Sequence, residues 1–274
     1  MGIKLIASDM DGTFLRKDNM YNVERFAKLL VELNNRQIKF VAASGRQIRN
    51  LQELFQPVLD EGHQIDYVAS NGAVVSTFDQ KLYSVHLTPD ELGKVIDWNA
   101  KNPESAENLI IMTGEETTYI SNHATPEVAA QVKLFYPNVK QVEKLLAVDE
   151  KILEVTFVWP TDEVQHHVAK LREVFGNELH ATGSGFGSVD ILGHGVDKAT
   201  GIQVLQDYYD VLDDEVMVFG DNGNDLEMLQ KYTNAYVMPN ASPFMLQSIN
   251  KKALADNRAD GVMNTIEDWL EKNG

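Results

Sequence analysis

Residues 4–13 read KLIASDMDGT, and this stretch decides the fold class. Its first half is a short apolar run, and two carboxylates and a glycine follow it directly. A short apolar run that ends in this way is typical of a strand buried in a parallel sheet. Polar groups after such a strand lie at the sheet edge where α/β proteins bind their ligands. The stretch therefore predicts an α/β fold with functional groups after its first strand.

The alternation of strand and helix continues beyond this stretch. Residues 21–36 have helical spacing, 38–43 form a second apolar run, and 48–59 are again helical. This order is typical of a parallel sheet with crossover helices. From residue 85 to residue 187, short strand-like runs mix with helices, and the alternating pattern resumes at 188. We therefore expect a core of residues 1–84 and 188–274 that carries an inserted α+β domain, residues 85–187.

Composition excludes several classes of protein. The formal net charge of −17 repels nucleic acid and anionic membrane surfaces. No stretch approaches the roughly 20 apolar residues that cross a bilayer, and the first residues do not form a secretory signal. The absence of cysteine removes disulfides, thiolate zinc sites and cysteine nucleophiles. We expect a cytoplasmic protein without a nucleic-acid or membrane partner.

Two carboxylates, Asp9 and Asp11, stand two residues apart after the first predicted strand. They are costly at the end of a buried strand unless cations or hydrogen bonds compensate them. An ordinary Asp-Gly turn is one explanation. The other is chemistry, with Asp9 attacking phosphorus to form an aspartyl-phosphate. Asp11 would then protonate the leaving alkoxide and later take a proton from water.

Two further groups suit a phosphate. Ser44 and Gly45 follow the predicted strand 38–43, and a hydroxyl and an amide at a strand end can hold phosphate oxygens. A plain turn and helix cap explains them equally well. Lys198 begins a predicted helix, which would bring an ammonium and a helix amino end to one anion. A solvated surface lysine is the commoner alternative.

The apolar run VMVF, residues 216–219, is followed by Gly220 and then by DNGND, residues 221–225. The carboxylates of Asp221 and Asp225 suit Mg²⁺, which needs only one or two protein carboxylates. A calcium loop is the alternative, but the segment lacks the acidic spacing and terminal Glu of an EF-hand. Because ligands bind outside the carboxyl ends of parallel strands, we expect all four clusters to converge.

Taken in order, DMDGT (9–13), ASGR (43–46), Lys198 and GDNGND (220–225) resemble the four motifs of the haloacid dehalogenase superfamily. The inserted domain resembles the C2-type (C2B) cap of the Cof-like sugar-phosphate phosphatases. Three more segments are similar to that subgroup: SNGA (70–73), VDKATG (196–201) and MPNA (238–241). The resemblance covers essentially the whole chain. It implies a Rossmann-like three-layer parallel-sheet core with an inserted α+β cap domain, and a Mg²⁺-dependent phosphatase of small phosphoric monoesters.

By position, the resemblance also implies residue roles. Asp9 matches the nucleophile, which is also a magnesium ligand. Asp11 matches the general acid/base, whose backbone carbonyl also binds the metal. Asp221 matches a further metal ligand. Asp225 matches a residue that supports the metal and the lysine without ligating. The phosphate-binding positions correspond to Met10, Ser44, Gly45, Lys198 and Asn224.

The cap is expected to select the leaving group, with Arg46 from the core and His123 and Ser184 from the cap as candidate readers. A cap over the site favours small phosphorylated metabolites, sugar phosphates first. A phosphomutase on sugar phosphates and a non-enzymatic phosphosugar-binding regulator are the alternatives. We expect a monomer or a weak homo-oligomer.

Overall fold

The computed structural model describes residues 2–105, 108–160, 163–185 and 187–273. The chain divides into two compact units, here called the core (Met1–Ser84 and Asp197–Gly274) and the cap (Val85–Val196). Each unit has its own sheet and its own hydrophobic cluster. Among the described residues, no helix has both the length and the apolar character that crossing a membrane requires.

The core is built on a seven-stranded sheet in the order β13-β12-β1-β2-β3-β4-β5. Neighbouring strands are parallel from β13 to β3, and β4 and β5 are added antiparallel. The strands are β1 (Leu5–Ser8), β2 (Lys39–Ala43), β3 (Asp66–Ala69), β4 (Val74–Ser76), β5 (Lys81–Ser84), β12 (Val216–Gly220) and β13 (Asn234–Val237). Strand β1 pairs on both sides, with Leu5 opposite Val216 of β12 and Lys39 of β2. The carboxyl ends of β12, β1 and β2 therefore lie at one edge of the sheet.

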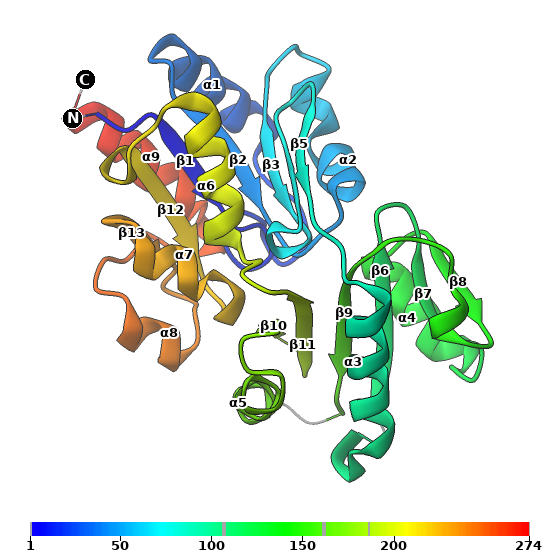
Figure 1. Cartoon of the computed structure of the whole chain (residues 1–274). Coiled ribbons are helices and arrows are strands. Elements are labelled where there is room, and N and C mark those ends of the chain that lie inside the picture. The colour runs from blue at the N-terminus through cyan, green and yellow to red at the C-terminus, as the bar shows by residue number, and fades with distance from the viewer. Residues whose placement is uncertain (1, 106–107, 161–162, 186, 274) are drawn as a thin grey trace. The chain divides into compact units, whose positions relative to one another are not determined.

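Helices cover both faces of this sheet and give the core three layers (Figure 1). On one face, Leu5 and Val41 belong to a buried cluster with Ile202 of α6 and Met228 of α7. On the other face, the ring of Phe26 in α1 lies 4.9 Å from that of Phe40 and 5.8 Å from that of Phe55 in α2. The core helices are α1 (Val23–Asn35), α2 (Ile48–Leu59), α6 (Lys198–Tyr209), α7 (Leu226–Lys231), α8 (Pro243–Ser248) and α9 (Gly261–Lys272). The predicted Rossmann-like α/β core is confirmed.

The cap has a six-stranded sheet in the order β10-β11-β9-β6-β7-β8, antiparallel except for the β7–β8 pair. Helices α3 and α5 pack on one face through Val95, Val168 and Leu171, and α4 packs against Ile111 and Ile120 on the other. The cap strands are β6 (Leu109–Gly114), β7 (Thr118–Ser121), β8 (Val139–Val142), β9 (Ile152–Val158), β10 (Leu179–Gly185) and β11 (Ser188–Gly193). The cap helices are α3 (Pro89–Lys101), α4 (Pro126–Phe135) and α5 (Val164–Phe175).

The return of the chain to the core differs from the prediction. We expected residue 188 to begin the second core segment, but Ser188–Gly193 forms β11, which pairs with β9 and β10 of the cap sheet. The return follows Val196. In this strand the polar residue Asp190 stands between the apolar residues Val189 and Ile191. Such alternation is typical of an antiparallel strand whose two faces differ, whereas a strand buried in a parallel sheet is a continuous apolar run. The predicted boundary was wrong because β11 is followed by the helix α6, the same order of elements as in the core.

Candidate active site

Side chains from two strand ends and one helix meet at the edge of the core sheet. Asp9 follows β1, Asp221 follows β12, and Lys198 is the first residue of α6. The Lys198 ammonium donates to Asp9 Oδ1 at 2.6 Å and to Asp225 Oδ1 at 2.7 Å. Lys198 and Asp225 are fully buried. Lys198 is therefore no solvated surface lysine, and it joins the first and the last of the predicted clusters.

Three carboxylates surround this single ammonium. Ligand oxygens of Asp9, Asp221 and Asp225 all lie within 4.8 Å of one another. Burial, followed by the charge of Asp225, raises the pKa of Asp9 well above its ordinary value, although Lys198 acts in the opposite direction. The same two causes raise the pKa of Asp221 to about 7. The site thus holds more negative charge than its lysine neutralises, and its oxygen donors fit a hard divalent cation.

Asp225 has both of its carboxylate oxygens in use. Its Oδ1 accepts from Lys198, and its Oδ2 accepts from the backbone N–H groups of Asp221 at 2.8 Å and Asn222 at 3.0 Å. A side chain added at Gly220 would come within 2.5 Å of Asp225 Cβ, so the turn needs glycine there. Asp225 consequently orients the lysine and the loop, whereas Asp9 and Asp221 are better placed to ligate.

The Asp221 carboxylate is seated by the loop after β1. Thr13 Oγ1 donates to Asp221 Oδ1 at 2.6 Å. Gly12 has φ +84°, and a Cβ at that position would stand 2.5 Å from Asp221 Oδ2. Glycine is therefore required both for this backbone conformation and for the close approach of the carboxylate.

Asp11 lies outside the carboxylate group and forms an ion pair with Arg46. Arg46 Nε donates to Asp11 Oδ2 at 2.8 Å, and a terminal nitrogen donates to Oδ1 at 2.5 Å. Burial opposes the charge of Arg46, but the bonds to Asp11 outweigh it and raise the pKa of the guanidinium. Arg46, predicted to contact the substrate, is thus engaged by the predicted acid/base.

The other predicted phosphate-binding residues gather at the same edge. Ser44 is buried, and its Oγ accepts from the backbone N–H of Arg46 at 3.2 Å. Asn224 donates through Nδ2 to Asn71 Oδ1 at 3.0 Å. Met10 is fully buried, and a contact of its backbone N–H with a phosphate stays a prediction. A Cβ at Gly45 would lie 3.2 Å from the Asn71 amide, which packs beside that backbone.

Three residues that the sequence analysis assigned no role also shape the site: Thr13, Asn71 and Asn240. Asn71 has φ 52° and binds Asn224, and Asn240 Nδ2 donates to the carbonyl of Gly12 at 2.7 Å. Both asparagines stand in the segments SNGA and MPNA that resemble the Cof-like subgroup. The resemblance of those segments could have drawn attention to the two asparagines. Sequence spacing, however, does not predict which groups their side chains hydrogen-bond.

The two predicted cap residues lie on different elements. His123 is exposed in the turn between β7 and α4, where its backbone N–H donates to Ser121 Oγ at 3.1 Å. Ser184 lies in β10 at a register irregularity between Gly183 and Gly185. Their contact with a leaving group stays a prediction.

The cap contains another cluster of possible metal ligands, Glu104, His166 and His167. Lys170 Nζ lies 2.8 Å from Glu104 Oε2, so this carboxylate already has a cation. The ring of His167 stacks on Trp159 at 4.0 Å between centroids. The core cluster, with its excess of carboxylates, is the stronger metal candidate.

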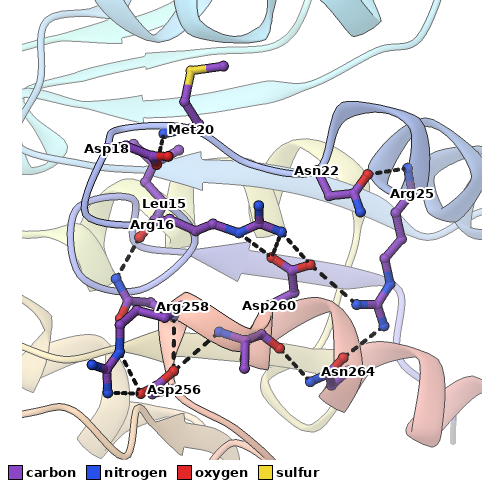
Figure 2. A network of polar contacts seen from close by, with 12 residues as sticks. Leu15, Arg16, Asp18, Met20, Asn22, Arg25, Asp256, Arg258, Asp260 and Asn264 are labelled. Atoms are coloured by element: carbon purple, nitrogen blue, oxygen red, sulfur yellow. Dashed lines mark hydrogen bonds and ion pairs between the residues drawn. The ribbon is translucent and has the colours of Figure 1, made fainter.

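A polar network anchors the segment that follows the Gly12 loop (Figure 2). Arg16 donates to both oxygens of Asp260 at 2.7 and 2.8 Å, and Arg25 reaches Asp260 at 3.5 Å and Asn264 at 2.8 Å. The carbonyl of Leu15 accepts from Asn257 Nδ2 at 2.7 Å. The C-terminal segment thereby holds the chain that leaves the site.

The chain is similar to known proteins over nearly its whole length. The sequence profile of haloacid dehalogenase-like hydrolases matches residues 6–266. The Escherichia coli K12 protein named 5-amino-6-(5-phospho-D-ribitylamino)uracil phosphatase YbjI is 32% identical, over 99% of this chain and 97% of its own length. The HMP-PP phosphatase of Enterobacter sp. strain 638 is 23% identical, over 98% of this chain and 96% of its own.

Solved structures are similar over the same extent. The crystal structure of SMU.1108c from Streptococcus mutans UA159 has a TM-score of 0.91 and 29% identity, and covers 98% of this chain and 100% of its own. BT4131, described as a sugar phosphatase of HAD subclass IIB, has a TM-score of 0.78 and 18% identity, over 97% of this chain and 99% of its own. At that identity the latter shows the fold alone.

Proposed function

The chain belongs to the haloacid dehalogenase-like hydrolase family, as a Cof-like hydrolase of phosphoric monoesters, and we propose that it acts through an aspartyl-phosphate on Asp9 with Mg²⁺ as cofactor. The observation that carries the proposal is the contact of Lys198 with both Asp9 and Asp225, 2.6 and 2.7 Å away. Through this contact the proposed nucleophile Asp9, the ammonium of Lys198 that would bind the phosphoryl oxygens, and the acidic cluster lie together in one buried site.

The donor set supports a hard divalent ion. Asp9 and Asp221 would hold it, together with the backbone carbonyl of Asp11, while Asp225 keeps its hydrogen bonds to Lys198 and the loop. When bound, Mg²⁺ neutralises the carboxylates and the phosphate and so lets two anions meet. Burial, followed by the charge of Asp225, raises the pKa of both Asp9 and Asp221, and a bound cation would offset both causes.

The first chemical step forms a covalent bond between protein and phosphorus. An Asp9 oxygen attacks the phosphorus in line with the ester oxygen, the P–O ester bond breaks, and Asp11 gives its proton to the leaving alkoxide. Lys198, Ser44, Asn224 and the backbone N–H groups of Met10 and Gly45 hold the phosphoryl oxygens. Phosphoryl transfer depends mainly on such positioning and charge stabilisation.

The second step releases phosphate. Asp11, now a carboxylate, takes a proton from water while the water oxygen attacks phosphorus, and the bond between phosphorus and Asp9 breaks. Asp11 must leave Arg46 to serve as the acid, because Arg46 occupies both of its carboxylate oxygens. We propose that Arg46 holds Asp11 when no ester is bound and contacts the substrate when one is.

The substrate is, in this proposal, a small phosphorylated metabolite with a sugar or sugar-alcohol part. The name of one relative supports it, since YbjI is named for a phosphoribityl compound. The alternatives on the same residues remain a phosphomutase and a phosphosugar-binding regulator. Cytoplasmic location and a monomer or weak homo-oligomer stay predictions.

A screen of phosphorylated metabolites with Mg²⁺, which measures free phosphate, tests the proposal. Release of phosphate from sugar or sugar-alcohol phosphates is expected, together with a phosphoryl adduct on the peptide that contains Asp9 after a rapid acid quench. A mutase would instead need a bisphosphate primer and return an isomerised ester with little free phosphate. A regulator would bind phosphosugars without turnover.

A further inference from the structure

The loop that follows β12 contains an Asn-Gly pair, Asn222 and Gly223. In such a pair the amide nitrogen of the glycine can attack the side-chain carbonyl carbon of the asparagine, because glycine has no side chain in the way and its backbone rotates easily. Asparagine is accordingly one of the thermolabile residues of proteins. A second pair of the same kind, Asn71 and Gly72, belongs to the same unit of the chain but lies in very different surroundings.

The amide nitrogen of Gly223 lies beside the side chain of Asn222. Asn222 caps the short 3-10 turn Gly223–Asp225, and both members of the pair are partly exposed. The N–H of Gly223 donates to Asn222 Oδ1 at 2.8 Å, so the nitrogen is next to the carbonyl group that it would attack. Because Gly223 is the first residue of its turn, it has no backbone acceptor within the turn. No helical hydrogen bond therefore has to break before this nitrogen reacts.

The pair Asn71–Gly72 is held rigidly by its neighbours. Asn71 is 1% exposed, has φ 52°, and accepts through Oδ1 from Asn224 Nδ2 at 3.0 Å. Gly72 has φ +100°, and a Cβ at that position would stand 2.1 Å from the carbonyl oxygen of Asp197. This close packing leaves no room for the backbone movement that ring closure requires. The two pairs thus share their chemistry and differ in their freedom to react.

We propose that Asn222 is a site of spontaneous deamidation, and that this modification inactivates the neighbouring acidic cluster as the protein ages. The Gly223 nitrogen loses its proton and bonds to Cγ of Asn222, the bond from Cγ to Nδ2 breaks, and ammonia leaves, which gives a succinimide ring. Water then opens the ring. Breakage of the ring bond at Cγ gives aspartate, and breakage at the main-chain carbonyl carbon gives isoaspartate.

Conversion to isoaspartate alters the loop that carries Asp221. In the unmodified loop, Asp225 Oδ2 accepts from the N–H groups of Asp221 and Asn222 at 2.8 and 3.0 Å, and the Asp225 N–H donates to the Asn222 carbonyl at 3.0 Å. In isoaspartate the chain runs through the former side chain and gains a methylene carbon, and the former carbonyl becomes a carboxylate near Asp225. The longer backbone and the repulsion between like charges displace Asp221 and Asp225. The modification does not depend on the proposed function, but its effect on hydrolysis does.

Incubation of the full-length protein in mildly alkaline buffer tests the proposal, with Asn71 as the internal control. Mass spectrometry of proteolytic peptides follows the replacement of NH₂ by OH at each asparagine, and protein isoaspartyl methyltransferase labels the isoaspartate. We expect Asn222 to react about tenfold or more faster than Asn71, because Asn71 can react only after local unfolding. A rate at Asn222 no higher than at Asn71 overturns the assignment of the site.

A glycine variant tests the route of the reaction. Gly223→Ala should slow the reaction at Asn222 about tenfold, because the added methyl group obstructs the attack. Alanine is compatible with the backbone there, since Gly223 lacks the positive φ that would require glycine. Gly93→Ala on α3 is the matched control, because its Cβ would meet nothing within 4 Å, and it should leave the rate unchanged. An unchanged rate in Gly223→Ala contradicts the succinimide route.

Phosphatase activity measured during the same incubation tests the consequence. The fraction of activity lost should equal the fraction of isoaspartate formed at residue 222. Asn222→Ser should keep its own initial activity throughout, because serine can cap the turn and cannot deamidate. Full activity after complete conversion overturns the inactivation. Absence of hydrolysis in the fresh protein overturns the proposed function instead, while the mass spectra still decide the modification.

Discussion

Two charge clusters of the core differ in how their charges are balanced. In the anchoring network, Asp260 receives two arginines, and Arg25 also pairs with Glu267, so each carboxylate has a guanidinium. At the site edge, three carboxylates of Asp9, Asp221 and Asp225 surround the single ammonium of Lys198. A cluster that only holds the fold can be neutral, whereas excess negative charge in a buried place is costly and favours the binding of a further cation.

Asp9→Asn tests the site cluster most severely. We expect loss of turnover by a factor of about 10⁴ or more, because no nucleophile remains. The metal-free variant should melt no lower than the wild type, since burial and Asp225 already disfavour the Asp9 carboxylate. Phosphate release and thermal unfolding are the measurements. Substantial phosphate release would sink the nucleophile assignment.

Mg²⁺ should act on the site cluster alone. Chelation is expected to stop hydrolysis, and Mg²⁺ at a hundred times its dissociation constant should stabilise the fold by about 2.7 kcal/mol. Asp221→Asn should weaken this stabilisation, because it removes one ligating carboxylate. Calorimetry with and without Mg²⁺ checks it, and Glu32→Gln, in an exposed ion pair on α1, serves as the control. Full activity in excess chelator contradicts the metal assignment.

Asp260→Ala perturbs the balanced cluster. It leaves Arg16 and Arg25 without their shared, largely buried partner, and we expect a loss of about 2 kcal/mol in the free energy of unfolding. Glu32→Ala, which breaks an exposed pair with Arg36, should cost about 0.5 kcal/mol or less. Urea unfolding measures both. Equal losses would show that the network adds nothing beyond a surface pair.

The pH dependence of metal-free stability is a separate test of the site cluster. Asp221 has its pKa raised to about 7 in the fold, against about 3.9 in the unfolded chain. Between these values the folded state binds more protons, so this group makes stability fall as pH rises from about 4 to 7, by at most about 1.4 kcal/mol per pH unit. Mg²⁺ should abolish this component. Asp221→Asn tests its origin by urea unfolding in chelator, and an unchanged slope would assign it elsewhere.

Much of the core could be predicted because local signals and topology agree. Helix 48–59 and helix 198–209 lie where the sequence indicated, and the site clusters follow β1, β2 and β12 as expected. The end of the cap could not be placed, because β11 is followed by a helix in the same way as a core strand. Its pairing with β9 and β10 assigns it to the cap.

The site was predicted at the level of residue types and less well at the level of contacts. The sequence brought Asp9, Asp221 and Lys198 to one edge, but the pairing of Asp11 with Arg46 and the support from Asn71 depend on loop backbone geometry.

The pairing of β1 with β12 also has a consequence for synthesis of the protein. Because Leu5 of β1 lies opposite Val216 of β12, one edge of β1 stays unpaired during synthesis until β12 has been made. On the ribosome, the whole cap emerges during that interval and can fold while the core is still incomplete. A nascent chain that stops before residue 216 would expose an apolar edge of β1, a template for aggregation. Stalling late in translation is therefore the hazardous moment for this fold.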